Sequence, residues 1–305
     1  MKLPLKPLLL VLGGAASLYA LALFLAADIP LGKLLMRLLS PIGLVVIVLC
    51  LLNFVLRGLR WRMWMAQTQR PLGVLEGLRL YLAGYTFTPT PGNVGEAARG
   101  LLLARNPLSP AQSLALFGAE RLADLLCLLL LCLPGVGWLL LQAPERWMAW
   151  WPVAVLSVAL GALLLALLLR KFKQPILQRF GWLQAAWQCL STQPLIWFSL
   201  TLVAWAAQGV ALWLICVDNG LTIPLLLASG FYALAMVGGA LAMLPAGLGG
   251  MEALLTGLLI SQGATAGVAL GITMLIRLLT LWLAVVIGAL ALLYSAAIKK
   301  DIRLQ

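Results

Sequence analysis

Residues 91–96 read Pro-Gly-Asn-Val-Gly-Glu, and residues 245–252 read Pro-Ala-Gly-Leu-Gly-Gly-Met-Glu. Both stretches lie inside long apolar sequence, and in each an arginine follows the final glutamate by 25 positions (96 to 121, and 252 to 277). Proline and glycine break helices, so each stretch predicts a turn between two short helices. Because the whole pattern occurs twice, we predict an internal structural repeat of a kind that is common among membrane transporters.

The composition is that of a protein embedded in a membrane. Of the 305 residues, 63% are hydrophobic and 10% are charged, and the mean hydropathy is +1.05. Several apolar stretches reach the length of about 20 residues that a helix needs to span a bilayer. Little sequence remains for a soluble module, so residues 1–305 are predicted to form a single, all-α, integral membrane domain.

Charge and residue types disfavour several classes of function. The formal net charge is +12, but the basic residues lie at the ends of apolar segments rather than on one soluble face, so we expect no nucleic acid partner. The chain has no histidine, which is the commonest general base and a frequent metal ligand, and its five cysteines are scattered. We therefore expect no metal, no cofactor and no catalytic nucleophile.

The apolar segments predict a polytopic helical architecture. Six of them are long enough to cross a bilayer alone: 8–27, 41–59, 110–142, 150–170, 194–217 and 265–296. Two more, 71–105 and 224–260, contain the glycine turns and are interpreted as re-entrant hairpins of broken helices. Such breaks are tolerated at membrane depth only inside protein or around a polar cavity. The alternative is that each hairpin is an ordinary pair of spanning helices.

The basic residues predict the orientation. If the N-terminus lies inside and the hairpins enter from opposite faces, 14 lysines and arginines fall inside and 3 outside. The inner group includes Arg57 and Arg60, and Trp61 and Trp64 are interpreted as markers of the inner border. This topology predicts a multi-pass protein of a bacterial inner membrane with both termini in the cytoplasm.

The same topology predicts two inverted repeats. Repeat one spans residues 41–142 and begins by crossing inwards, whereas repeat two spans residues 194–296 and begins by crossing outwards. Inverted repeats allow alternating access, because exchanging the conformations of the two halves opens a central site to the other side.

Ionisable residues within the apolar segments are the candidate functional residues, because they are costly there unless paired or hydrated. They are the carboxylates Glu96, Glu120, Asp124 and Glu252 and the arginines Arg99, Arg121 and Arg277. Glu120 and Asp124 share one helical face, a spacing that suits a shared proton or cation. The equal spacing of Glu96 to Arg121 and of Glu252 to Arg277 suits two structural salt bridges.

The functional alternative is a phosphate site. The planar fork of arginine matches a phosphate, and its charge persists on burial. Glycines in the turns would let backbone N–H groups at half-helix N-termini approach the anion: Gly92, Gly95, Gly247, Gly249 and Gly250. The glutamates of the turns equally suit a role as partners of the helix N-termini. Asn53 and Arg57, four positions apart, are interpreted as packing and snorkelling side chains.

These motifs resemble the lysylphosphatidylglycerol synthase transmembrane-region family, also called flippase-like integral membrane proteins. The resemblance covers nearly the whole chain and rests on three strings: Pro91 through Glu96 to Arg99, Glu120 through Asp124, and Leu244 through Glu252 with Arg277 beyond. Two positions depart from the family pattern, since Ala246 stands where glycine is common and Asn93 where a basic residue is expected.

The resemblance implies a role with lipids. In bifunctional members of the family, the membrane half is tied to translocating a lysylated lipid, and a separate soluble domain transfers the aminoacyl group. That soluble domain is not expected here, so synthase activity is not carried over. Stand-alone members are expected to move phospholipids or polyprenyl-phosphate-linked sugars.

Three hypotheses follow. The first is a flippase for a phospholipid or a lipid-linked sugar of the cell envelope, in which Arg121 and Arg277 bind the phosphate, with Arg99 and the glycine turns contributing. The second is an accessory membrane subunit that presents lipid to a biosynthetic enzyme without transporting it. The third is a membrane-embedded enzyme that modifies a lipid with Glu120 and Asp124 as an acid/base pair.

Overall fold

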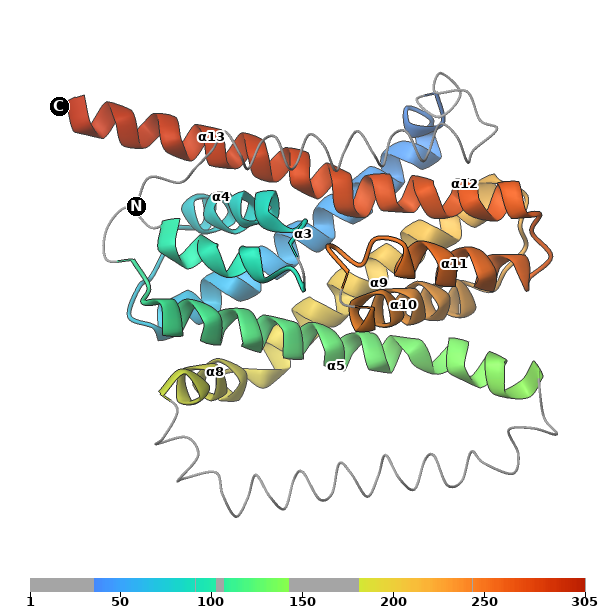
Figure 1. The fold of residues 1–305 in the computed structure, drawn as a ribbon, viewed down its shortest axis with the longest axis horizontal. Helices are drawn as coiled ribbons and strands as arrows, with labels where there is room; N and C mark the ends of the chain where they lie inside the picture. Colours follow the sequence, from blue (N-terminus) through green and yellow to red (C-terminus); the bar gives the residue numbers. More distant parts are fainter. Residues whose placement is uncertain (1–35, 91, 103–106, 143–180, 243, 305) are drawn as a thin grey trace, which may run out of the picture.

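The computed structural model describes residues 36–90, 92–102, 107–142, 181–242 and 244–304, in which the elements are all helices (Figure 1). Four runs in this part of the chain are long and apolar enough to cross a membrane: α3 (Pro41–Gln67), α5 (Pro110–Gln142), α9 (Pro194–Asp218) and Ala266–Ser295. They coincide with four of the six predicted spans. The other two, 8–27 and 150–170, lie outside the described residues.

Local sequence explains how the long helices begin and continue. α3 begins after Ser40, whose hydroxyl accepts from the N–H of Gly43 at 3.1 Å, and proline occupies the first helical position. The last span consists of α12 (Ala266–Arg277), the π-helical turn η3 (Leu278–Trp282) and α13 (Leu283–Leu304) in direct succession. π-helical turns often accompany functional sites, and this one directly follows Arg277.

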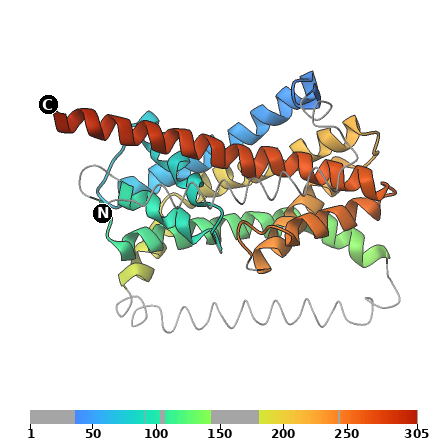
Figure 2. The same ribbon diagram turned by 45° about the horizontal axis from the view of Figure 1, so that its top comes forward.

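The two interrupted segments form pairs of short helices separated by turns. The first pair is α4 (Val74–Gly84), which continues as η1 (Tyr85–Phe87), and η2 (Val94–Leu102). The second pair is α10 (Leu225–Leu241) and α11 (Gly250–Ile260). Both turns contain left-handed backbone, with φ of 60° and 56° at Gly92 and Asn93 and of 54° and 67° at Ala246 and Gly247. The turns of the two pairs lie near each other in the middle of the molecule (Figures 1 and 2).

The long helices pack against each other and against the short helices of the two pairs. α3 lies against α9, α5 lies against α10, and α13 lies against α4 and η1. Two of these contacts are very close, because a Cβ atom at Gly230 would lie 2.6 Å from the backbone nitrogen of Gly135, and one at Gly288 would lie 2.6 Å from that of Thr86. Small residues at such crossings let helix backbones approach closely. A short helix, α8 (Gly181–Ser191), packs on α5.

The C-terminal end of α3 is buried in protein, which corrects the interpretation of its side chains as exposed markers of a membrane border. Trp61 and Trp64 are 1% and 0% exposed, and Arg57 and Arg60 are 6% and 0% exposed. α3 extends to Gln67, eight residues past the predicted end at 59, so it carries these side chains into the core between α5 and α9. When Arg57 and Arg60 are left out, the predicted topology has 12 lysines and arginines inside and 3 outside, so the excess of basic residues is still on the predicted inner side.

Candidate functional site

Arg99 forms the centre of a buried charge cluster in repeat one. Its Nη2 donates to Oε2 of Glu96 at 2.6 Å, and its Nη1 donates to both carboxylate oxygens of Glu120 at 2.6 and 2.9 Å. The residues come from η2 and α5, and all three side chains are nearly inaccessible. Gly84 makes room for the guanidinium, because a Cβ atom there would lie 2.4 Å from Nε of Arg99. Glu120 is therefore a structural partner of Arg99.

Asp124 is held by two arginines of α3. Nη2 of Arg57 donates to its Oδ2 at 2.6 Å, and Nη1 of Arg60 donates to its Oδ1 at 2.8 Å. The indole N–H of Trp205 on α9 donates to Oδ1 at 3.2 Å. Arg57 thus forms a buried ion pair, which corrects its interpretation as a snorkelling side chain. The shortest ion pairs of Glu120 and Asp124 are with different arginines, Arg99 for Glu120 and Arg57 with Arg60 for Asp124. The one cationic group that contacts both carboxylates among the described residues is Arg121, at the longer distances of 3.9 and 3.4 Å.

Aromatic rings complete the environment of these arginines. The guanidinium carbon lies over a ring at 4.4 Å for Arg99 on Tyr81, at 5.0 Å for Arg57 on Trp205, and at 5.2 Å for Arg121 on Phe117. Cation–π contacts of this kind strengthen when they are desolvated. A carboxylate on one side and a ring on another fix each guanidinium in place, which offsets part of the cost of burying its charge.

Arg121 is held more loosely than the other arginines. Its Nη2 lies 3.4 Å from Oε2 of Glu96, 3.4 Å from Oδ2 of Asp124 and 3.9 Å from Oε2 of Glu120. Its side chain is 31% exposed, whereas that of Arg99 is 3% exposed. The predicted pairing of Glu96 with Arg121 is present, but it is a long contact within a shared cluster rather than an isolated salt bridge.

Within the described residues of the segment 194–296, one tight ion pair is recorded. Nε of Arg277 donates to Oε1 of Glu252 at 2.7 Å, as the spacing predicted. Oε2 of Glu252 accepts from the N–H of Gly249 at 2.7 Å, so the same carboxylate also caps the start of α11. Nη2 of Arg277 donates to the carbonyl of Ala246 at 2.9 Å and thereby ties α12 to the turn. Glu252 therefore both forms the predicted salt bridge with Arg277 and interacts with the N-terminus of helix α11.

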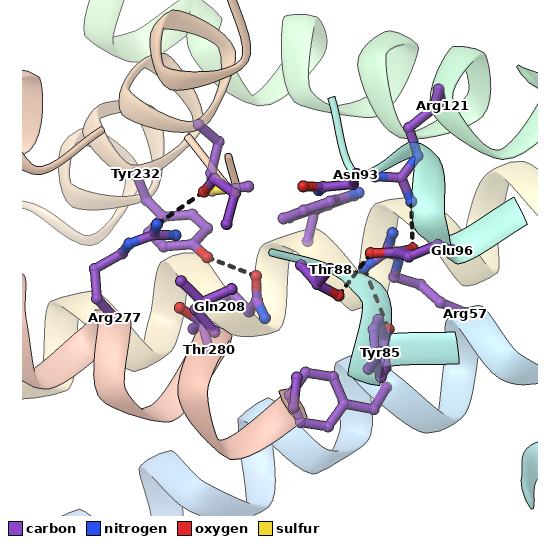
Figure 3. A pocket seen from close by; sticks show the side chains of 16 residues that line it. Arg57, Tyr85, Thr88, Asn93, Glu96, Arg121, Gln208, Tyr232, Arg277 and Thr280 are labelled. Carbon is purple, nitrogen blue, oxygen red and sulfur yellow. Dashed lines mark hydrogen bonds and ion pairs between the residues drawn. The ribbon is translucent and has the colours of Figure 1, made fainter. Parts of the chain in front are cut away.

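The two halves meet at one cavity (Figure 3). The segment 41–142 contributes Arg57, Glu96 and Arg121, and the segment 194–296 contributes Arg277. The cavity holds about 80 Å³, enough for several water molecules by the measure of roughly 10–15 Å³ each. Other lining residues come from both halves: Phe54, Tyr85, Thr88, Asn93, Trp205, Gln208, Tyr232, Met236, Ala246, Thr280, Leu281 and Ala284.

Comparison with known proteins identifies the family. A family model described as the lysylphosphatidylglycerol synthase TM region matches residues 9–288. The chain belongs to this family. It is therefore a multi-pass membrane protein of a lipid-related family, in agreement with its apolar helices. Searches of curated proteins and of solved structures gave no match.

Of the predicted binding residues, this family member places only Arg121 and Arg277 at the cavity. Arg99 does not line it, because its guanidinium faces Glu96 and Glu120 behind the wall. Arg121 and Arg277 each keep donors for a ligand, since among the described residues no partner is recorded for Nη1 of either one. The lining charges are three arginines and one glutamate, so the wall carries a formal charge of +2 (3 − 1).

Three of the five turn glycines do not offer their N–H groups to a ligand in this structure. The N–H groups of Gly95, Gly247 and Gly249 are used within the protein, by Thr90, Leu244 and Glu252 respectively. None of the five predicted glycines lines the cavity, whereas their neighbours Asn93 and Ala246 do. The glycines allow the backbone conformation and the close packing of the two turns. Gly92, Gly247 and Gly249 have positive φ, and Gly95 and Gly250 lie close to Phe87 and Ala242.

Sequence reasoning missed the polar residues of the long helices. Gln208 lies in the middle of the apolar span 194–218, and Tyr232 and Thr280 lie in similarly apolar helices, yet all three line the cavity. An uncharged polar side chain in a membrane span is a weak signal, because such residues also serve helix packing. Arg57 carried a stronger signal as a charge within apolar sequence, but its place near a helix end favoured the snorkelling interpretation.

Proposed function

We propose that this protein is a transporter of flippase type for a lipid or a lipid-linked sugar, and that it binds the anionic phosphate headgroup in the central cavity. The observation that carries the proposal is the convergence of Arg57, Arg121 and Arg277 from both halves on one cavity. Ionisable side chains buried in membrane-type helices mark a functional site by default, and these three arginines converge on one cavity while each also contacts a carboxylate. Arginine forks with unused donors suit a phosphate oxygen.

The architecture supports movement of the bound headgroup between two sides. The long helix α5 of residues 41–142 packs on the short helix α10 of residues 194–296, and α13 of the second segment packs on α4 of the first. This reciprocal packing supports a pair of structural repeats. The two turns lie near each other at the middle of the long helices, which supports re-entrant hairpins entering from opposite faces. With the predicted six spans, these repeats are inverted, and exchanging their conformations gives alternating access to the cavity.

The ion pairs and the binding role are compatible in this proposal. The contacts of Arg277 with Glu252 and Ala246 use Nε and one position on Nη2, which fixes the guanidinium while leaving Nη1 for a ligand. The long contacts of Arg121 allow a phosphate to compete with the carboxylates for its donors. Arg277 is thus the fixed anchor of the proposed site, and Arg121 is its adaptable partner.

A flipping assay in protein-only liposomes tests the proposal. Fluorescent phospholipids are placed in both leaflets, and the loss of fluorescence after adding an impermeant quencher reports exchange between leaflets. We expect transport by the wild type and its loss in Arg277→Ala. The matched control is Arg62→Ala, because Arg62 donates to the carbonyl of Leu72 at 2.7 Å and lies outside the cavity lining.

Three outcomes would redirect the interpretation. Full transport by Arg277→Ala would rule out the arginine site. Absence of transport by the wild type, together with a co-purifying biosynthetic enzyme, would support the accessory-subunit hypothesis instead. A covalently altered lipid in the assay would indicate an enzyme, although Glu120 and Asp124 are both engaged by arginines in the structure.

A further inference from the structure

We infer that the headgroup bound in the central cavity is a phosphodiester that carries hydroxyl groups and no amine. This inference rests on the proposed function and specifies the substrate class of the same site. A glycerol or sugar attached to phosphate has this chemistry, whereas ethanolamine or lysyl headgroups do not. Two features of the cavity support this: one wall is polar but uncharged, and Glu96, the only lining carboxylate among the described residues, already accepts hydrogen bonds within the protein.

Repeat two presents a neutral polar wall built from Gln208, Tyr232 and Thr280 (Figure 3). The hydroxyl of Tyr232 donates to Oε1 of Gln208 at 2.6 Å, and that of Thr280 donates to the carbonyl of Ile276 at 2.8 Å. Both hydroxyl hydrogens are therefore used within the protein, and the Thr280 hydroxyl also lies within hydrogen-bond range of that of Tyr232. A hydroxyl oxygen has two lone pairs, so this pair of hydroxyls retains acceptor capacity. Within the described part of the chain no acceptor is recorded for the side-chain amide of Gln208, which remains a donor.

The turn of repeat one adds a second amide to the cavity. Asn93 has left-handed backbone with φ of 56° and lines the cavity, and no side-chain hydrogen bond is recorded for it among the described residues. The cavity thus offers amide donors and hydroxyl acceptors beside the arginines. A ligand hydroxyl both donates and accepts, so it is complementary to this combination. The phosphate is complementary to the arginines.

An ammonium group finds no counter-charge in the cavity. Glu96 is the lining carboxylate, and its Oε1 accepts from Thr88 at 2.8 Å while its Oε2 accepts from Arg99 and Arg121. The aromatic face of Trp205 is likewise occupied, because the guanidinium of Arg57 lies 5.0 Å from its centroid. An amine would therefore enter a cavity in which the lining carboxylate already accepts from two arginines, and in which Asp124 and Glu252 are engaged by Arg57 and Arg277. The lysyl lipid in the family's name carries amino groups of this kind.

Competitive native mass spectrometry of the purified full-length chain tests the inference. The probes are dioleoyl lipids at equal concentration: phosphatidylglycerol, phosphatidylethanolamine, lysylphosphatidylglycerol and phosphatidylethanol. Phosphatidylethanol has the same charge as phosphatidylglycerol but no hydroxyl, so it separates hydroxyl recognition from charge. A polyprenyl phosphoglucose is measured in parallel, and it shows whether the hydroxyl-bearing phosphate comes from a glycerophospholipid or from a lipid-linked sugar.

We expect phosphatidylglycerol or the phosphoglucose to be retained at least about tenfold over both amine lipids and over phosphatidylethanol, a difference of about 1.4 kcal/mol. Gln208→Glu keeps an acceptor for Tyr232 but replaces the amide donor with a carboxylate. This variant is expected to lower the discrimination against lysylphosphatidylglycerol by about tenfold.

The outcomes separate this inference from the proposed function. Equal or better retention of an amine lipid, lost in Arg277→Ala, would overturn the inference and leave the phosphate site standing. Equal retention of phosphatidylethanol and phosphatidylglycerol would overturn hydroxyl recognition. Retention of every lipid without regard to Arg277 would overturn the phosphate site and the inference together.

Discussion

Replacing Asp124 by Asn is expected to destabilise the protein strongly. The carboxylate accepts from Arg57 at 2.6 Å, from Arg60 at 2.8 Å and from Trp205 at 3.2 Å, and it is 4% exposed. The amide removes the negative charge and leaves two buried guanidinium groups without their counter-ion. Removing one partner of a buried ion pair costs on the order of 3–5 kcal/mol, because an uncompensated charge remains.

The matched control is Asp218→Asn, the same substitution at an exposed position for which no ion pair is recorded among the described residues. A change of about 1 kcal/mol there is an upper expectation, since exposed ion pairs contribute little. The assay is thermal unfolding of the purified variants in one detergent, followed by intrinsic tryptophan fluorescence. We expect a clear decrease in Tm for Asp124→Asn and a value close to wild type for Asp218→Asn.

A second variant checks the electrostatic cause. Adding Arg60→Met to Asp124→Asn removes one of the two guanidinium groups that lose their counter-ion. Arg60 does not line the cavity, so the substitution leaves the lining unchanged. Because buried ion pairs replaced by apolar groups are often neutral in stability, the double variant is expected to regain part of the lost Tm. A Tm of Asp124→Asn equal to that of the wild type would refute the assigned pairing, and so would a Tm of the double variant no higher than that of Asp124→Asn.

Two further predictions concern Arg99 and Arg277. Gly84→Ala would place a Cβ atom 2.4 Å from Nε of Arg99, so we expect a loss of about 1–3 kcal/mol in thermal unfolding, whereas Gly257→Ala has open space and should not destabilise. Equal stability of the two alanine variants would contradict the close contact. Glu252→Gln should lower stability by about 1.5–3 kcal/mol through loss of a charge-assisted hydrogen bond. It should also leave retention of a phosphate lipid in native mass spectrometry intact, and loss of that retention would mean that the pair itself forms the site.

The long apolar helices and the glycine turns could be predicted from sequence because each has a strong local cause. Apolar length fixes a spanning helix, and proline with glycine fixes a break. The pairing of Arg277 with Glu252 was predictable as well, since the 25-residue spacing recurs. The resemblance leads us to expect a glycine at position 246, and the φ of 54° at Ala246 is a backbone conformation that favours glycine.

The composition of the cavity depends on contacts between distant helices and was therefore missed in part. Arg57 and Arg60 lie near the end of an apolar segment, and only the packing of α3 against α5 and α9 places them beside Asp124. Gln208 and Thr280 meet across the interface of α9 with the last span, which no local pattern encodes. Arg99 was predicted to bind ligand because its charge is buried, but the partner of that charge is Glu120 on another element.

Arginines from both halves of the protein are proposed to bind one phosphate headgroup. Native mass spectrometry of the gently purified protein tests this proposal most directly, with the wild type beside Arg121→Ala and Arg277→Ala and with Arg62→Ala as the control. The account predicts that the wild type and Arg62→Ala retain a specific phosphate-bearing lipid and that both cavity variants lose it. Indiscriminate lipid retention, unchanged by either cavity substitution, would contradict it and would leave these arginines with a structural role alone.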